Sequence, residues 1–231
     1  NNRNQIQTLS RYQRKKLKLI RGHFAFGLHY FLDCPATYFT MIRDPVTRFI
    51  SNYYYQQRRI KDEKLKQLSL EDFVWLRGKE QANTQTKMLC GLTPKMENRT
   101  KETMLQIAKD NVDKHFSSVG LLERFDESLV LFRKQFNWNF PFYLQQNKSI
   151  NKPNHYQNLS QEALNSLREY NAIDIELYKY VSQKFQKEID DMGESFNQEL
   201  NLQKYFNKLY QPLGTVYNYA RNQYFQYIGN Y

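Results

Sequence analysis

Apolar residues along the chain occur in short continuous runs and in helical stripes. Residues 38–42 form a β-prone run that stops at Arg43 and the pair Asp44-Pro45. The apolar positions that follow are spaced as on one face of a helix: Phe49, Ile50, Tyr53 and Tyr54. An aspartate before a proline is typical of a helix start, because the carboxylate accepts free backbone N–H groups and proline has none to lose. The pattern predicts a strand, a tight turn and a helix that begins at Val46 or one residue earlier.

A second strand and helix follow later in the chain. The run from Phe116 to Leu122 predicts a short strand, and the next apolar residues recur at helical spacing: Phe125, Leu129, Phe132 and Phe136. Alternating basic and apolar residues predict another strand from Leu17 to Phe24. Strands that alternate with helices are typical of α/β folds, so we expect a mostly parallel central sheet flanked by helices.

Capping residues and helical spacing predict the remaining helices. Ser69 and Ser160 are expected to begin helices, and Gly91 and Gly193 to end them. Helices are predicted at 100–109, at 159–170, from Asn171 or Asp174 onward, and near 196–210 with a tail behind it. The 231 residues suit a single domain, in which 194–231 is a polar, aromatic C-terminal extension.

The net charge narrows the choice of partners. A formal charge of +11 and a pI near 9.5 predict an anionic partner, which nucleic acid, an acidic polysaccharide and an anionic nucleotide all satisfy. Cys34 and Cys90 are the only cysteines, so a single bridge and two free thiols are both allowed, and no zinc spacing occurs. The sequence contains no run of about eighteen apolar residues, so it predicts no membrane span.

The end of the strand at 38–42 is the candidate ligand site. Arg43 lies where open α/β sheets bind ligands, and Arg48 and Ser51 share a face of the following helix. A guanidinium, a hydroxyl and a helix N-terminus in one place suit a phosphate group. The alternative is that Arg43 and Asp44 form only an ion pair that fixes the turn.

The string Arg-Asp-Pro-x-x-Arg-x-x-Ser at residues 43–51 resembles the 3′-phosphate-binding motif of sulfotransferases that use PAPS, 3′-phosphoadenosine 5′-phosphosulfate. Residues 53–55 resemble the heparan sulfate and uronyl 2-O-sulfotransferase branch, and residues 119–125 resemble a second block of that family. The resemblance implies a P-loop-nucleotide-binding type of fold and transfer of a sulfuryl group from PAPS to a hydroxyl of a glycosaminoglycan-like carbohydrate. It also implies that Arg43 and Ser51 bind the 3′-phosphate and that no metal takes part.

The same resemblance suggests a catalytic base. His23 follows Gly22 about twenty residues before the Arg-Asp-Pro string, as the base does in the 2-O-sulfotransferase branch. His29 is the alternative, because the 6-O branch has a histidine at a similar place. Either residue can instead be a loop histidine bonded to the backbone. Arg21, which lies two residues before His23, is expected to contact the acceptor.

Two further segments carry candidate contacts. Residues 83–91 resemble a segment near the acceptor in these enzymes, so Asn83, Gln85 and Thr86 are expected to bind sugar hydroxyls; a surface position without ligand is an equal alternative. Lys148 lies in a basic loop like one that folds over the nucleotide in related enzymes, and a merely solvated loop is as compatible.

The donor site predicted from the sequence is incomplete. Enzymes of this class hold the 5′-phosphosulfate in a Lys-containing turn after their first strand, and no such turn precedes Arg43. We therefore expect a fragment that lacks that strand and loop and is inactive alone. A non-catalytic protein of sulfotransferase fold that binds an anionic glycan is the alternative. A basic nucleic-acid-binding module is disfavoured, because the aromatic residues fall mainly at core positions.

The expected cellular setting follows from the resemblance. Sequons at Asn98, Asn147 and Asn158 are compatible with a secretory lumen. We expect a glycoprotein of the Golgi lumen, held as a type II membrane protein by an anchor outside this chain, or a cytoplasmic protein if the source is bacterial. The sequence leaves the oligomeric state open.

Overall fold

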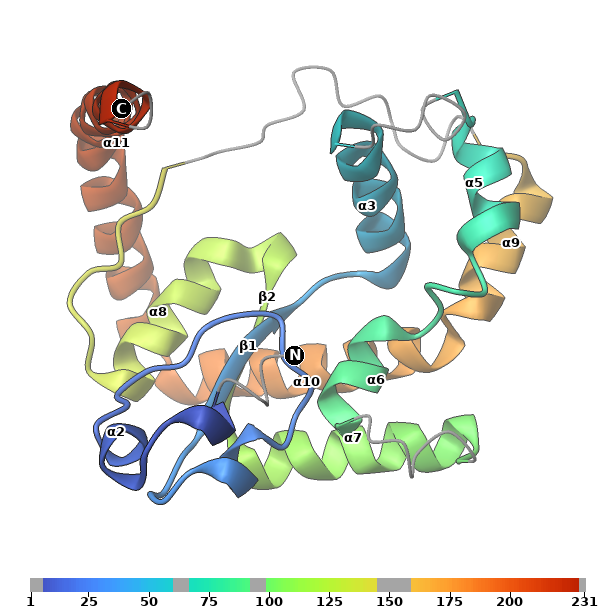
Figure 1. The fold of residues 1–231 in the computed structure, drawn as a ribbon, viewed down its shortest axis with the longest axis horizontal. Coiled ribbons are helices and arrows are strands. Elements are labelled where there is room, and N and C mark those ends of the chain that lie inside the picture. Colours follow the sequence, from blue (N-terminus) through green and yellow to red (C-terminus); the bar gives the residue numbers. More distant parts are fainter. Residues whose placement is uncertain (1–5, 60–66, 92–98, 145–158, 229–231) are drawn as a thin grey trace.

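The structure is a computed structural model that describes residues 6–59, 67–91, 99–144 and 159–228, with side chains described up to residue 221. It is a mixed α/β fold in which helices predominate (Figure 1). Its helical elements include, in chain order, α2 (Arg11–Lys15), η1 (Leu28–Phe31), α3 (Pro45–Arg59), α5 (Leu70–Arg77), α6 (Thr84–Cys90), α7 (Lys101–His115), η3 (Leu122–Arg124), α8 (Phe125–Phe136), α9 (Gln161–Tyr170), α10 (Ala172–Met192) and α11 (Glu194–Ile228).

The sheet of the described residues consists of two parallel strands, β1 (Tyr38–Ile42) and β2 (Phe116–Leu121). Tyr38 pairs with Phe116, and Ile42 pairs with Leu121, so the two strands end together. Parallel strands need a long crossover, and the helices α3, α5, α6 and α7 supply it here. The strands and their direction are as predicted. The sheet is smaller than the central sheet expected, and the P-loop type of fold stays a prediction.

The strand predicted from Leu17 to Phe24 is wrong. The segment is irregular and takes no part in the sheet. Its apolar and basic residues alternate, but neither face is covered: Leu19 is 59% exposed, and Lys18 and Arg21 are exposed as well. Alternation predicts a strand only where one face is buried and the edge finds a partner, and this segment has neither in the described part of the chain.

Two hydrophobic clusters meet at the carboxyl end of β1. The first joins the two strands to α6, α7, α8 and α10, with Val130, Leu177 and Phe185 at its centre. The second lies between α3, α5 and α9, around Ile50 and Leu167 (Figure 1). Because α3 starts directly after β1, the strand end is fixed by both clusters at once.

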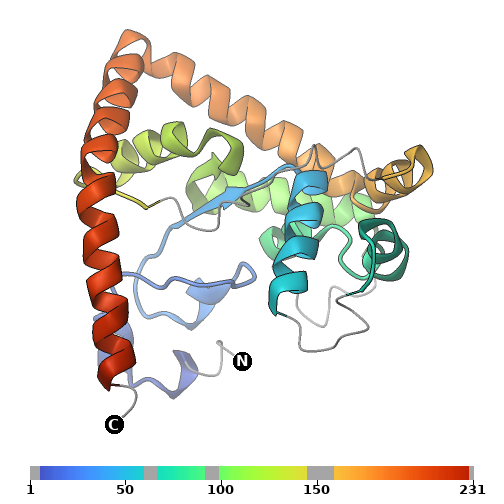
Figure 2. The same ribbon diagram turned by 90° about the horizontal axis from the view of Figure 1, so that it is seen from above.

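The local signals for helix ends are confirmed. Ser69, Thr100 and Ser160 each accept a backbone N–H of the first turn of their helix, and Gly91 ends α6 in the left-handed conformation with φ 75°. The lengths differ in two places. The helix predicted at 100–109 extends to His115, and the helix predicted near 196–210 continues through Pro212 to Ile228. Figure 2 shows this last helix, α11, along one edge of the molecule.

Close packing of α8 on β2 depends on Gly120. A Cβ at this position would lie 2.7 Å from the Cβ of Ser128, which is closer than side chains approach. Ser128, fully buried, donates its hydroxyl hydrogen toward the carbonyl of Leu121 at 3.0 Å and accepts the N–H of Leu121 at 2.9 Å. The glycine therefore lets the helix bind the end of the strand, where Glu123 follows.

Cys34 and Cys90 are both free thiols, so of the two alternatives left by the sequence the structure has the unbridged one. Cys90 is buried, and this burial raises the pKa of its thiol. Such a cysteine behaves as a small core residue rather than as a nucleophile.

Candidate functional site

The turn after β1 is built as the sequence predicts. Asp44 caps α3: its Oδ1 accepts the N–H of Thr47 at 2.8 Å, and its carbonyl accepts the N–H of Arg48 at 2.8 Å. Pro45 is the first residue of the helix. Arg43 thus stands between the last residue of the strand and the cap of the helix, at the edge where both strands end.

Glu123 joins the ends of the two strands. Its Oε1 accepts the backbone N–H of Asp44 at 3.1 Å and lies 3.7 Å from Nε of Arg43. Its Oε2 accepts the hydroxyl hydrogen of Tyr178 at 3.0 Å. Burial, and then the negative charge of Glu123, raise the pKa of Tyr178 well above its ordinary value, so this hydroxyl stays a donor. The guanidinium of Arg43 is held in place yet remains partly exposed, with 29% of the side chain accessible.

The amide of Gln85 brackets the backbone of Arg43. The N–H of Arg43 donates to Oε1 of Gln85 at 2.8 Å, and Nε2 of Gln85 donates to the carbonyl of Arg43 at 2.8 Å. This pair of bonds replaces the neighbour that a strand residue would have in a sheet. Gln85 therefore fixes the main chain at the point where β1 turns into α3.

A carboxylate from another helix holds Gln85. Asp174 of α10, 1% exposed, accepts the backbone N–H of Gln85 at 3.1 Å and that of Thr86 at 2.7 Å. It caps the start of α6, because the N-cap residue Asn83, just before the helix, has a left-handed backbone (φ 52°) and makes no side-chain cap. Asn83 instead accepts the backbone N–H of Asp174 at 3.1 Å and donates its own N–H to Asn171 at 3.2 Å.

These contacts define what the predicted acceptor residues do. Asn83, Gln85 and Thr86 are 3%, 9% and 0% exposed, so they are not the surface residues that the sequence left as the alternative. Their bonds support the turn at Arg43. Direct contact of these three residues with an acceptor stays a prediction, and their burial favours a positioning role.

Arg48 carries an unbalanced charge. Its Nη1 is buried and has no hydrogen-bond partner within the described residues. Burial lowers the pKa of its guanidinium, and the charge of Asp174 opposes this effect. Burial is the larger of the two effects, so the charge of Asp174 offsets it only in part. A part-buried guanidinium in this state favours an added anion.

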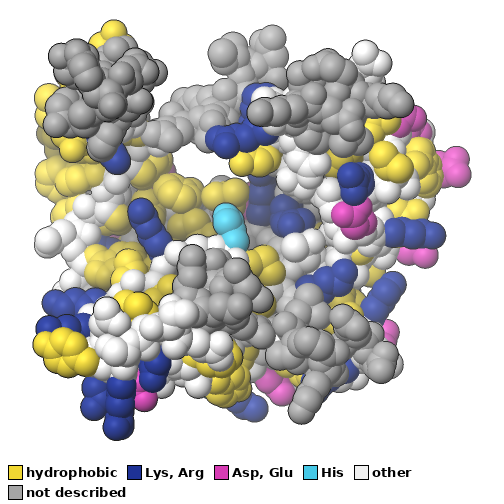
Figure 3. Space-filling view, viewed as in Figure 1, with side chains coloured by type: hydrophobic (Ala, Val, Ile, Leu, Met, Phe, Trp, Pro, Cys, Tyr) yellow, Lys and Arg dark blue, Asp and Glu magenta, His cyan; other side chains and the backbone are white. Residues whose placement is uncertain are grey.

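Positive charge gathers at this site. Arg43, Arg48 and Ser51 come from one strand end and the first two turns of one helix, with Ser51 one turn beyond Arg48. Figure 3 shows Lys and Arg side chains in the hollow between the strands and α3. The arrangement can bind a phosphate through charge-assisted hydrogen bonds. Lys148, the other predicted donor contact, lies outside the described residues.

The two candidate bases lie in different surroundings. His23 is exposed on the irregular segment that also carries Arg21, so the predicted strand does not position it beside β1. His29, in η1, is partly buried and shares a 2.8 Å hydrogen bond between its Nδ1 and the hydroxyl of Tyr38. Tyr38 begins β1, about 16 Å from Arg43 at strand geometry. Burial and the nearby His115 lower the pKa of His29.

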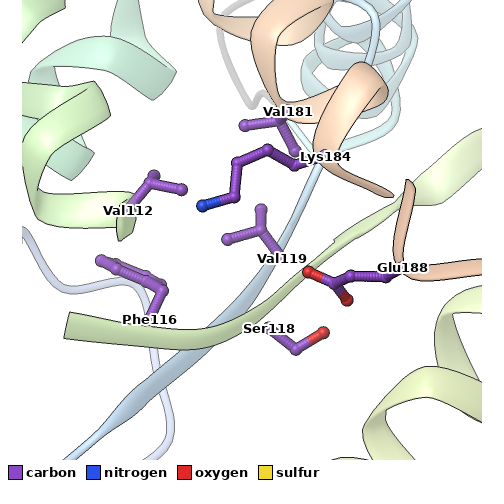
Figure 4. A pocket seen from close by; sticks show the side chains of 7 residues that line it. All are labelled: Val112, Phe116, Ser118, Val119, Val181, Lys184 and Glu188. Atoms are coloured by element: carbon purple, nitrogen blue, oxygen red, sulfur yellow. The ribbon is translucent and has the colours of Figure 1, made fainter. Parts of the chain in front are cut away.

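A small cavity lies away from this edge (Figure 4). It has a volume of about 20 Å³ and lies between α7, β2 and α10. Its lining includes Ser118, whose buried hydroxyl has no partner in the described part of the chain, and Glu188, whose pKa is raised by burial. The space suits one water molecule and is far too small for a nucleotide.

Comparison with known proteins identifies the class of protein to which this arrangement belongs. The family model described as Galactose-3-O-sulfotransferase matches residues 10–205, which is most of the chain. The chain is also similar to the uronyl 2-sulfotransferases of Homo sapiens and Mus musculus, each 26% identical over 209 residues, with 78% of this chain covered. It spans about half the length of these curated relatives. The protein is of the carbohydrate sulfotransferase class, as its motifs suggested. It belongs to the galactose-3-O-sulfotransferase family.

Sequence reasoning missed the residues that support the site. Glu123 lies inside residues 119–125, the segment that resembles a block of the family, but no role was predicted for its carboxylate. Asp174 was considered only as a helix start, and its bonds to α6 have no local signal because they come from 88 and 89 residues away. The one available hint was the position of Asp174, which is in phase with the apolar residues Leu177 and Val181 of the same helix.

The role of Asp174 predicts a large effect of its removal. We expect Asp174→Ala to lower the free energy of unfolding by about 3–5 kcal/mol, because two backbone donors lose a charged acceptor in a buried place. Urea denaturation followed by circular dichroism measures it. Asp190→Ala, in the exposed last turn of the same helix, is the control and should change stability little. Equal effects of the two substitutions would contradict the capping role.

The lowered pKa of His29 predicts a pH effect. The unfolded chain binds a proton at this residue more readily than the folded protein does. The contribution of His29 to the free energy of unfolding is therefore complete above about pH 6.5 and declines as the pH falls below that value. We expect His29→Gln to lose less stability than the native chain between about pH 7.5 and about pH 5.5. Thermal unfolding at both pH values measures this difference. His23→Gln, at an exposed position, should follow the native chain; parallel curves for all three proteins would refute the assignment.

Proposed function

We propose that the protein transfers a sulfuryl group from PAPS to a hydroxyl of a glycosaminoglycan-like carbohydrate. The observation that carries this proposal is the cluster of Arg43, Arg48 and Ser51 at the joint of β1 and α3, where a buried guanidinium nitrogen has no partner within the described residues. Membership of a carbohydrate sulfotransferase family supports the reaction class. The chain would supply the 3′-phosphate side of the donor site.

The residues at this joint fit the donor. Arg43 and Ser51 would bind the 3′-phosphate, as in the motif they match, and the positive charge of Arg48 would be balanced by the same group. PAPS, when bound, supplies the sulfuryl group and a bisphosphate leaving group. Glu123 and Gln85 hold the side chain and the main chain of Arg43, so the site needs little ordering when the donor binds. Lys148 remains a proposed contact.

A base must take the proton of the acceptor hydroxyl, which is a poor nucleophile near neutral pH. We propose His23 for this role, since it is exposed and its ring makes no hydrogen bond in the described part of the chain. Arg21, on the same segment, would contact the acid groups of the acceptor. His29 is the alternative: its lowered pKa keeps it neutral, but its ring is bonded to Tyr38.

A second candidate is a non-catalytic protein of this family that binds an anionic glycan. The net charge of +11 favours it, because charge alone attracts such a polymer without a complete donor site. The two functions differ in their response to PAPS, since only the enzyme releases adenosine 3′,5′-bisphosphate.

The cellular setting proposed is the Golgi lumen, with an anchor outside the 231 residues. Among the described helices, no stretch is apolar and long enough to cross a lipid bilayer. In the same residues no group of His, Cys, Asp and Glu side chains is arranged to hold a metal ion. The sequons at Asn98, Asn147 and Asn158 lie outside the described residues.

Binding of the donor product tests the site. Arg43→Ala should weaken the binding of adenosine 3′,5′-bisphosphate by about 1.5–3 kcal/mol, the scale of a charge-assisted hydrogen bond. Isothermal titration calorimetry gives this difference. Arg58→Ala removes an exposed arginine from the last turn of the same helix and serves as the control. An unchanged affinity of the Arg43 variant would defeat the assignment.

Turnover tests the base. In a chain that also carries the 5′-phosphosulfate loop, His23→Ala should lower the rate by about two to four orders of magnitude, because a positioned base is lost. The affinity for the bisphosphate should stay nearly the same. His29→Ala should do much less. A larger effect of His29→Ala would make His29 the base, and small effects of both would mean that another group takes the proton.

A further inference from the structure

Positive charge is concentrated near the start of the described chain. Between residues 6 and 32 there are six Lys and Arg residues and no Asp or Glu. This stretch therefore carries more than half of the formal net charge of +11. It comprises α2, the irregular segment that holds His23, and η1. The charge excess of the protein thus belongs largely to one continuous stretch, and that stretch contains the proposed catalytic base.

Five of the six basic residues are exposed. We name them the α2 basic surface, and they are Arg11, Lys15, Lys16, Lys18 and Arg21. Lys15, Lys18 and Arg21 form no ion pair within the part of the chain that the structure describes. Figure 3 shows Lys and Arg side chains gathered over α2, at the lower left of the view. Most of the positive charge in this surface is therefore open to solvent and to a ligand.

The sixth basic residue, Arg14, fixes this surface to its surroundings. Its Nε donates to Oδ2 of Asp33 at 2.9 Å, and its Nη1 donates to the carbonyl of Leu9 at 2.7 Å. Asp33 is the only acid between residues 6 and 43, and Arg11 lies 3.6 Å from its second oxygen. One carboxylate therefore orients α2 and leaves the other cations unbalanced. Cations held near one another repel, so a ligand with several negative charges is favoured.

We propose that the α2 basic surface binds an anionic polysaccharide, through sugars of the acceptor chain that do not themselves react. The surface leads along the chain to Arg21 and His23, which are expected at the reacting sugar. A single sugar can contact one or two of these exposed side chains, whereas a charged polymer can contact all of them together. The inference rests on the proposed function in taking the acceptor as a carbohydrate polymer. It adds that this polymer is negatively charged outside the reacting unit, and where those charges bind.

Other polyanions fit this surface less well. Surfaces for single-stranded nucleic acid place several aromatic rings between the basic residues, so that bases can stack on them. Between residues 11 and 21 the only aromatic residue is Tyr12, and Nζ of Lys16 lies 4.2 Å from the centre of its ring. A helix that lies on a membrane needs a long apolar face, and α2 has only five residues. The carbohydrate sulfotransferase class of the protein also favours a polysaccharide.

Titration of the purified 231-residue chain with a heparin oligosaccharide, without PAPS, tests the proposal. The triple variant Lys15→Gln, Lys16→Gln, Lys18→Gln should raise the dissociation constant at least about tenfold, because three exposed contacts to negative charges are lost. The difference should shrink between about 0.05 M and about 0.15 M salt, since exposed charges are screened. The affinity of this variant for adenosine 3′,5′-bisphosphate should stay unchanged, which also shows that it is folded. Isothermal titration calorimetry measures both ligands.

The control removes the same charge elsewhere. Lys101→Gln, Lys204→Gln, Lys208→Gln changes three exposed lysines of α7 and α11, and it should bind heparin nearly like the native chain. Equal losses in the two triple variants would overturn the proposal, because net charge alone would then explain binding. Tighter binding of a single-stranded DNA of equal charge, or of phosphatidylserine vesicles, would assign the surface to that partner instead. A chain that binds the bisphosphate but not heparin would refute this inference and leave the donor site standing; the reverse result would refute the donor site alone.

Discussion

The carboxylate of Asp174 is the interaction on which the site depends. A buried carboxylate must have its oxygens satisfied, and here both oxygens accept backbone N–H groups at the start of α6. That helix start holds Gln85, and Gln85 holds the main chain of Arg43. The main chain of Arg43, whose guanidinium is partly exposed, is therefore fixed from α10, a helix that lies beyond the crossover in the sequence. Three elements that are remote in the sequence share one small polar network.

The two arginines of the motif are held in opposite electrostatic states. Arg43 has Glu123 as a neighbour, so its charge is partly balanced before any ligand arrives. Arg48 has a buried nitrogen without a partner in the described residues, and the charge of Asp174 offsets the effect of its burial only in part. Arg43, whose charge is partly balanced, gives the site its geometry, and Arg48, whose charge is not balanced, gives it a preference for anions.

The sequence predicted those features that have a local cause. Asp44 with Pro45, and the serine and threonine caps, act within one turn, so each helix start was placed correctly. The strand at 17–24 was wrong because alternation does not reveal whether a face is covered. The length of α11 was missed because a segment rich in Asn, Gln and Tyr, with Pro212 inside, is typical of a loop, while tertiary bonds such as that of Gln203 stabilise the helix. Asp174 was missed because its bonds to α6 are also tertiary and leave no local signal in the sequence.

The pairing of β1 with β2 also sets an order for folding. The segment α7, β2 and α8 is contiguous, and Gly120 with Ser128 lets its strand and helix pack through local contacts. In contrast, β1 meets β2 only after the whole crossover has closed, which is a slow, entropically costly step for any chain. The turn at Arg43 is complete only when that step is done. A partly folded chain in which β1 and β2 are unpaired would therefore lack an organised arginine site, and anion binding would then report the pairing of the two strands.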